Sequence, residues 1–172
     1  MFCLFLQQTA EVQHTKYPIG SADGIASEMA IIMYSDVVET IMNFNGQDNI
    51  DGVLETIEGL VYQHGGSTRT GDALERAESM LAESSCDSQV LVVITDGQSN
   101  AGVNVCEAAA RLKNDAEIYV VGVSSVNQSE MRCLASEPFD DHYYYARSYQ
   151  VAEHQIYSAA RSYIAAAAAA AA

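Results

Sequence analysis

The chain has 172 residues, of which 49% are apolar, and it carries a formal net charge of −15. This length and apolar content suit a single globular domain with a full hydrophobic core. The negative charge argues against nucleic acid or an anionic membrane surface as partner, because both require a basic patch. No apolar run has the length of a membrane span, and MFCLFL lacks the basic flank of a signal peptide.

The first half of the chain predicts a helix, two strands and two further helices. Apolar residues recur at helical spacing over Phe2–His14, and a turn follows at YPIGSADG. MAIIMY, residues 29–34, is a continuous apolar run that predicts a strand buried on both faces. VVETIMNF, residues 37–44, alternates between two faces as an antiparallel edge strand does. Amphipathic helices are expected at residues 50–61 and 71–82.

The second half alternates strands with helices. VLVVI, residues 90–94, predicts a fully buried strand that ends abruptly at Thr95-Asp96-Gly97. A helix (103–114), a strand (118–123), a helix (129–135), a strand (143–146) and a last helix (151–164) follow. This order predicts an α/β fold with a doubly wound, mostly parallel sheet, one antiparallel edge strand and helices on both faces. One domain is expected over residues 1–164, and the alanine run 165–172 is interpreted as placeholder residues.

A candidate metal site is expected at the carboxyl edge of this sheet, where such folds bind ligands. Asp96 follows the buried strand, and HGGSTRTGDAL, residues 64–74, brings a glycine-flanked hydroxyl loop to the same edge. Thr68 and Asp96 should then face each other, and a hydroxyl with a carboxylate suits a hard cation such as Mg²⁺. The alternative is a flexible loop that ends in a threonine N-cap.

Two of these stretches resemble a known family. GGSTRTGDAL and VLVVITDGQSNAG are similar to the second and third elements of the metal-ion-dependent adhesion site of von Willebrand factor A domains. YPIG, MAIIMYSD and ASEPFDDHYYYARSYQ fall where that family places a helix-to-strand turn, its second strand and its last strand. The resemblance is strongest to the extracellular matrix branch, which includes matrilins, non-fibrillar collagens and adhesive-thread matrix proteins.

The resemblance implies a site and a partner. Thr68 and Asp96 become the metal residues, and Ser67 and Thr70 become loop and cap residues. The implied cofactor is Mg²⁺, with Ca²⁺ or Mn²⁺ as alternatives. A partner's Glu or Asp would complete the coordination, so the expected function is protein binding in the extracellular matrix, with collagen or another matrix protein as partner.

The sequence departs from the family at its first element, an Asp-x-Ser-x-Ser motif after the first strand. With Phe2–His14 as the first helix, strand and motif would lie before Met1. An alternative register makes MFCLFL the strand and puts Gln7, Thr9 and Glu11 on the motif positions. Because this strand would be central, its loss would expose the edges of two apolar strands. We therefore expect an upstream extension or another segment to fill the gap, within a larger assembly.

The remaining candidates receive ordinary interpretations. Cys3, Cys86, Cys106 and Cys133 allow one or two disulfides whose pairing the sequence does not decide. Asn127 begins the sequon Asn-Gln-Ser, which is either a surface glycan site or a chance match. The histidines share no ligand spacing and are expected at the surface or rim: His14, His64, His142 and His154. Asp140 and Asp141 are expected in a solvated loop, and the tyrosine run Tyr143–Tyr145 in core and rim.

No catalytic triad, phosphate-binding loop or dinucleotide fingerprint is present, so an enzyme is not expected. Three interpretations compete. The first is a secreted adhesion domain that binds a protein through a divalent cation, and the second is a structural module of the same fold with a non-functional metal site. The third is an intracellular A domain, which the sequon and the cysteines disfavour.

Overall fold

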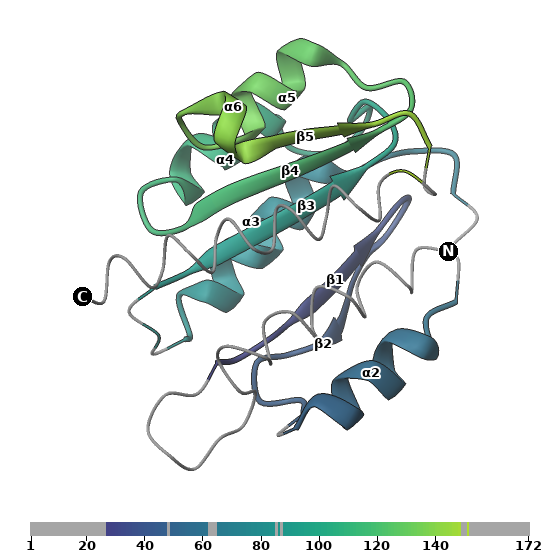
Figure 1. The fold of residues 1–172 in the computed structure, drawn as a ribbon, viewed down its shortest axis with the longest axis vertical. Helices are drawn as coiled ribbons and strands as arrows, with labels where there is room; N and C mark the ends of the chain where they lie inside the picture. Colours follow the sequence, from purple (N-terminus) through teal and green to yellow (C-terminus); the bar gives the residue numbers. More distant parts are fainter. Residues whose placement is uncertain are drawn as a thin grey trace.

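The computed structural model describes residues 27–47, 49–61, 65–84, 86, 88–148 and 151 of the chain (Figure 1). The elements are, in chain order, β1 (Ile31–Tyr34), β2 (Val38–Met42), α2 (Ile50–Glu58), α3 (Thr70–Leu81), β3 (Val90–Thr95), α4 (Val105–Leu112), β4 (Glu117–Val123), α5 (Gln128–Leu134), α6 (Phe139–His142) and β5 (Tyr143–Ala146). In the described part, no helix is long and apolar enough to cross a membrane.

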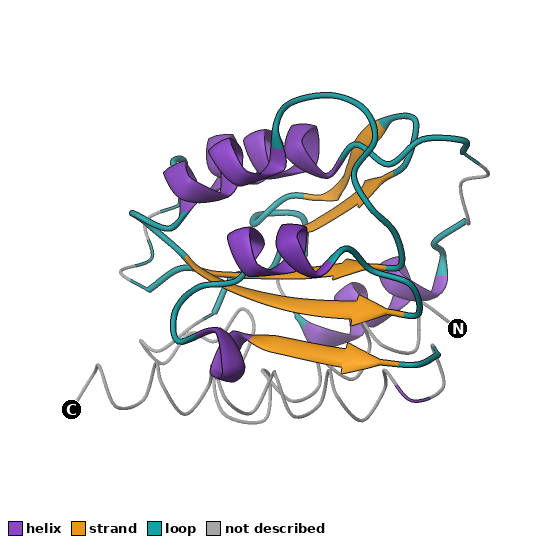
Figure 2. Cartoon of the chain, turned by 90° about the horizontal axis from the view of Figure 1, so that it is seen from above, coloured by secondary structure: helices purple, strands orange, loops and turns teal. Residues whose placement is uncertain are grey.

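Strands β3, β4 and β5 form a parallel sheet in which β4 is central. Val120 and Val121, two consecutive residues of β4, are both fully buried but belong to different hydrophobic clusters. This is expected for a strand that is covered on both faces. Helices α3, α4 and α5 pack against one face and supply most of the main core. Figure 2 shows helices lying on one side of the strands of this sheet. The predicted mostly parallel α/β architecture is confirmed.

Strands β1 and β2 form a separate antiparallel pair, which confirms the predicted edge strand. Helix α2 packs on this pair through Val53 and Ile57, both fully buried against Ile31 and Met42. Only Ile31 of β1 is buried, whereas the rest of that strand is half-buried. The expectation that MAIIMY is buried on both faces is therefore too strong for the described structure.

The two sheets approach each other through β1 and β3. The Tyr34 hydroxyl donates to the carbonyl oxygen of Ile94 across a distance of 3.1 Å. A small cavity of about 70 Å³ lies between β1, β3 and the first turns of α3, and Ile32, Leu91 and Thr70 are among its lining residues. The described residues of these two strands share no ladder pairing. A further strand between them, as expected from the sequence, stays a prediction.

The element boundaries differ from prediction mainly at caps. The helix expected at 103–114 begins later because the Asn104 side chain accepts hydrogen bonds from the amides of Cys106 and Glu107. The single turn α6 was not predicted, so Asp140 and Asp141 lie in a short helix rather than a loop, although both are exposed as expected. The helix predicted at 2–14, and all but the first residue of the one predicted at 151–164, lie outside the described residues.

Candidate functional site

The loop before α3 and the loop after β3 are joined through their backbones. The Thr68 amide donates to Asn100 Oδ1 at 2.9 Å, and the Asn100 amide returns a bond to the Thr68 carbonyl at 3.1 Å. The Ser99 hydroxyl also donates to that carbonyl, at 3.1 Å. A Cβ placed on Gly97 would lie 3.9 Å from Thr68 Oγ1, so the threonine hydroxyl faces the Asp96-Gly97 turn. The structure thus brings together the two loops that carry the predicted metal residues.

Asp36, which follows β1, holds the Thr68 loop from the other side. Its carboxylate accepts hydrogen bonds from the amides of Gly66, at 3.0 and 3.1 Å, and of Ser67, at 2.7 Å. The Ser67 hydroxyl donates to the same carboxylate. These hydrogen bonds hold the pKa of Asp36 below its usual value although the group is exposed, and the bond from the Ser67 hydroxyl contributes most. Ser67 is therefore a loop residue, as expected, and its hydroxyl is engaged by Asp36.

Glu130 holds the Asp96–Asn100 loop from α5. The Ser99 amide donates to both carboxylate oxygens of Glu130, at 3.0 and 3.2 Å. The residue is only 9% exposed and lies in the first turn of α5, beside the core residue Met131. Burial raises the pKa of Glu130, and the single amide offsets this only in part. Asp36 and Glu130 were not among the candidates from the sequence.

The start of α3 does not use a threonine cap. Arg69 occupies the N-cap position without a capping side-chain bond, and Thr70 is the first helical residue, 1% exposed and facing the cavity between the sheets. The cap role expected for Thr70 is therefore wrong, because the hydroxyl points into the interior. Asp72, in the first turn of α3, makes the polar contacts there instead. Its carboxylate accepts a hydrogen bond from the Val103 amide at 2.7 Å and pairs with the Arg69 guanidinium at 2.8 Å.

The electrostatic environment of this edge is negative. The two loops and the residues that hold them include four carboxylates, those of Asp36, Asp72, Asp96 and Glu130. The positive charge beside them is the side chain of Arg69, which pairs with Asp72. Burial raises the pKa of the Tyr34 hydroxyl below them to about 12, and the charges of Asp96 and Glu130 add to that rise. A negative field of this kind attracts cations.

The donor chemistry fits a hard cation with few protein ligands. Asp96 is exposed and Thr68 is half-buried, so both can be reached from solvent at the same edge. Within the described ranges no three His, Cys, Asp or Glu side chains gather into a metal-holding group. A hydroxyl and one carboxylate, with water on the remaining positions, are the kind of ligands that Mg²⁺ accepts. The fit is therefore to a weakly held hydrated cation rather than to a caged one.

Comparison with known proteins identifies the family. The family model for the von Willebrand factor type A domain matches residues 15–159. The chain belongs to this family. The collagen alpha-4(VI) chain of Mus musculus is 29% identical over 157 residues, a match that covers 85% of this chain and 7% of that one. Matrilin-1 of Homo sapiens is 37% identical over 98 residues, covering 57% of this chain and 19% of matrilin-1.

The A domain thus spans less than a fifth of either relative, and it is of the kind found in these extracellular matrix proteins. Among solved structures, proximal thread matrix protein 1 from the mussel byssus, with zinc occupying its MIDAS motif, matches with a TM-score of 0.83. Its sequence identity is 18%, and the match covers 94% of this chain and 42% of that one. This similarity shows the fold alone.

The cysteines of the A domain pair in a way that the sequence left open. Cys106 and Cys133 form a disulfide that joins α4 to α5, with their Cα atoms 5.2 Å apart. Cys86 has no disulfide partner within the described residues, and Cys3 lies outside them. The disulfide ties the Glu130 helix to α4, which begins just after the Asp96–Asn100 loop.

Asn127 of the sequon is the N-cap of α5. Its side-chain oxygen accepts from the amides of Ser129, at 2.9 Å, and Glu130, at 3.2 Å. This cap alone gives the residue a structural role. A glycan on Asn127 stays a prediction.

The expectation of surface or rim histidines is wrong for the buried His142, while His14, His64 and His154 lie outside the described residues. His142 is 4% exposed, 2.6 Å from the Glu117 carboxylate and 2.9 Å from the Pro138 carbonyl. Its ring also packs on Tyr119, with the centroids 4.5 Å apart. Of the tyrosine run, Tyr143 and Tyr144 are half-buried and Tyr145 is exposed, as expected of core and rim.

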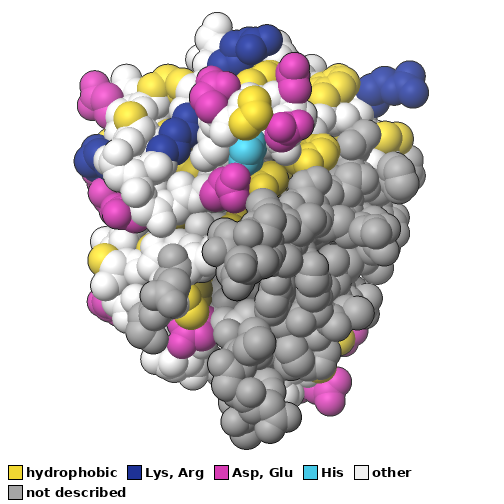
Figure 3. All heavy atoms as spheres, turned by 60° about the vertical axis from the view of Figure 1, so that its left-hand side comes forward, with side chains coloured by type: hydrophobic (Ala, Val, Ile, Leu, Met, Phe, Trp, Pro, Cys, Tyr) yellow, Lys and Arg dark blue, Asp and Glu magenta, His cyan; other side chains and the backbone are white. Residues whose placement is uncertain are grey.

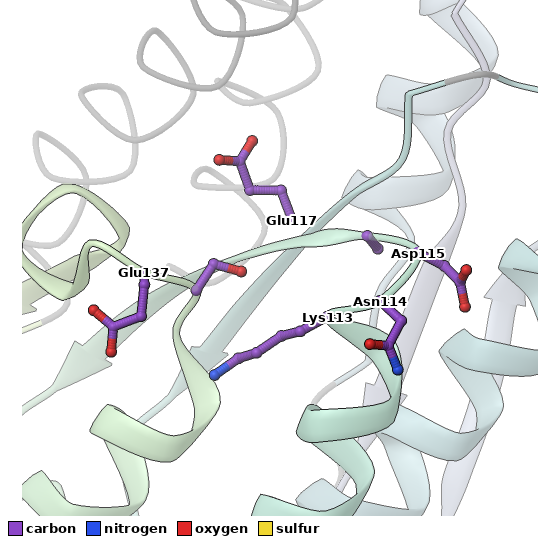
Figure 4. A pocket seen from close by; sticks show the side chains of 7 residues that line it. Lys113, Asn114, Asp115, Glu117 and Glu137 are labelled. Carbon is purple, nitrogen blue, oxygen red and sulfur yellow. The ribbon is translucent and has the colours of Figure 1, made fainter.

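An open hollow of about 530 Å³ lies beside the amino end of β4, where Glu117 begins the strand. Figure 4 shows that its labelled carboxylates, Asp115, Glu117 and Glu137, point in different directions. The Lys113 ammonium donates to the Cys133 carbonyl at 2.7 Å. Because the carboxylates diverge, this hollow offers no common point for a cation. The edge at Thr68 and Asp96 is the better candidate site.

Proposed function

We propose that this A domain is a secreted extracellular matrix module that binds a protein partner through a divalent cation held by Thr68 and Asp96. The observation that carries the proposal is the joining of the two loops by the reciprocal Thr68–Asn100 bonds. The role is binding, without a catalytic step. Mg²⁺ is the expected cation, and Mn²⁺ or Ca²⁺ would use the same oxygen ligands.

The cation would supply an electrophilic position that a partner carboxylate can enter. Thr68 would hold it through the hydroxyl and Asp96 through the carboxylate. Because these two residues would supply few ligands, the cation would stay open to water and to a Glu or Asp of the partner. On the face drawn in Figure 3, acidic side chains lie among apolar and basic ones. Contact between a partner carboxylate and the cation would be short-range and little screened by salt, so long-range attraction should contribute little to partner binding.

Two observations support an extracellular setting. The relatives are matrix collagens and matrilins. The Cys106–Cys133 disulfide is of a kind that persists in oxidising compartments and is rare in the cytosol. In native tissue the partner would be collagen or another matrix protein within a larger assembly. The mussel protein's zinc-occupied MIDAS motif makes a metal at this edge a natural proposal for this chain as well.

A thermal unfolding series tests the metal. Mg²⁺ or Mn²⁺ should raise Tm and EDTA should reverse the gain, because a ligand of the folded state stabilises it. Asp96→Ala should abolish the response and Thr68→Ala should weaken it. Asp115→Ala, an exposed acid outside these loops, is the matched control and should respond as the parent does. An identical Tm for the parent in Mn²⁺ and in EDTA would reject the metal site.

The second candidate is a structural module that packs in a fibre or complex without metal. It is favoured by the hydrogen bonds that Asp36 and Glu130 already make to the loops. Loops held by protein groups need no cation to keep their shape. Under this alternative, partner binding would be the same in Mg²⁺ and in chelator.

A further inference from the structure

We infer that Asp36 and Glu130 are positioning residues of this metal site, one for each ligand-bearing loop. The inference rests on the proposed function and extends it to residues outside the expected ligand set. Asp36 follows β1, and Glu130 lies on α5, so the two carboxylates come from separate elements. Both act on backbone amides, not on the ligand side chains themselves.

Asp36 fixes the approach of the chain to Thr68. Both of its oxygens accept the Gly66 amide, and one also accepts the Ser67 amide and hydroxyl. The next residue is Thr68, so the backbone immediately before the ligand hydroxyl is held from the β1 side. With its oxygens engaged in this way, Asp36 supports the loop and is not the carboxylate that would meet the cation.

Glu130 fixes the other loop from the interior. Its two oxygens share the Ser99 amide, three residues after Asp96. Glu130 is 9% exposed as a residue, and burying a charge there costs stability that a single amide does not return. A costly buried carboxylate aimed at the backbone of a ligand loop is the arrangement expected of a group that serves the site.

The two supports meet at the bonds between the loops. The Thr68 amide donates to Asn100 Oδ1, and the Thr68 carbonyl accepts from the Asn100 amide and the Ser99 hydroxyl. Asp36 is therefore connected to Glu130 by the hydrogen bonds at Ser67, by the Ser67–Thr68 peptide bond, and by the hydrogen bonds from Ser99 to Thr68 and Glu130. A cation with two protein ligands depends on their spacing, because it has no others to compensate. Removing the hydrogen bonds of either Asp36 or Glu130 should therefore let Thr68 and Asp96 occupy a wider range of positions.

The test measures Mn²⁺ affinity by calorimetric titration of the 172-residue chain. Asp36→Ala and Glu130→Ala should each weaken Mn²⁺ binding roughly 10- to 100-fold, the usual loss when a group supporting a metal ligand is removed. Asp36→Asn and Glu130→Gln keep an acceptor oxygen for the loop amide and should stay much closer to the parent. Glu137→Ala is the matched control, because Glu137 also accepts a backbone amide, that of Phe139 at 3.0 Å, outside these loops.

Amide hydrogen exchange in metal-free protein gives a second measurement. Asp36→Ala should speed exchange at Gly66 and Ser67, and Glu130→Ala should speed it at Ser99, with little change elsewhere. If Glu130→Ala does not fold, the exposed Asp36→Ala variant decides the outcome.

Unchanged Mn²⁺ affinity in the alanine variants would overturn the inference while leaving the proposed function intact. Equal losses in the alanine and the amide variants would also overturn it, because charge and not positioning would then be responsible. A parent chain that binds no Mn²⁺ would reject the proposed function itself, and the inference with it.

Discussion

Thr68 and Asn100 exchange two hydrogen bonds across the gap between their loops, from the Thr68 amide to Asn100 Oδ1 and from the Asn100 amide to the Thr68 carbonyl. Asn100 is exposed, so its side chain is not required for the core. The pair sets the spacing of the two loops that carry the expected metal ligands. A single substitution can remove the Asn100 side chain, and with it the hydrogen bond from the Thr68 amide.

Asn100→Ala should cost about 1 kcal/mol of unfolding free energy, because one hydrogen bond is lost at a partly exposed position. The gain in unfolding free energy on adding Mg²⁺ should also shrink, because the two loops that carry the metal ligands are no longer held at the same spacing. Denaturant unfolding with and without Mg²⁺ measures both effects. Asn114→Ala, in an exposed turn after α4, is the control. A full Mg²⁺ response in Asn100→Ala would show that the pair does not position the site.

Gly71→Ala should destabilise the chain by about 1–3 kcal/mol through overpacking. A Cβ at Gly71 would collide with the Val103 carbonyl, where α3 presses on the segment before α4. Gly66→Ala has open space around the new methyl group and retains the amide that Asp36 accepts, so its Tm should stay near that of the parent. Urea denaturation compares the two, and equal stabilities would contradict the close approach of α3 to Val103.

Replacing both Cys106 and Cys133 by serine should lower the unfolding free energy by about 3 kcal/mol, since the disulfide closes a loop between residues 27 apart in sequence. For a domain of this size, that corresponds to a fall in Tm of roughly 6–12 °C. Calorimetry under non-reducing conditions measures the fall. Cys86→Ser, at a half-buried position without a disulfide partner in the described part, should change Tm far less.

Acid should lower the unfolding free energy of the chain, partly through protonation of Asp72. The Val103 amide and then Arg69 hold the folded-state pKa of Asp72 below its usual value. A depressed folded pKa means that this contribution is present above the unfolded pKa of about 3.9. It is lost as pH falls through the folded pKa. Asp72→Asn should therefore flatten the decline of unfolding free energy below about pH 4. A slope identical to that of the parent in urea unfolding at several pH values would contradict this role.

Much of the fold could be predicted from local pattern. The apolar runs at β1 and β3, the alternation at β2, and the helical spacing of α3 each depend on neighbours in sequence. Asp96 could be found because a carboxylate follows a buried strand. The same reasoning applied to Asp36, which comes two residues after β1, would have identified it, since the signal is the same.

Other features depend on contacts that the sequence does not display. Glu130 has the appearance of an ordinary acid in the first turn of a helix, and its role appears only when Ser99, 31 residues earlier, lies against it. His142 is buried because Glu117, 25 residues away, supplies a partner. The pairing of Cys106 with Cys133 likewise needed the packing of α4 on α5. In each case a long-range partner decides a polar residue's role.

Partner binding with and without chelator tests the central claim most directly. Immobilised collagen, native or with its carboxylates converted to amides, is exposed to the chain and to its Asp96→Ala variant in Mg²⁺ and in EDTA. The account predicts binding by the parent chain to native collagen in Mg²⁺, with little change at moderate salt. That binding should be lost in EDTA, with the variant, and on the amidated collagen. Equal binding of the parent chain in Mg²⁺ and in EDTA would contradict the account and would assign the domain to metal-independent packing.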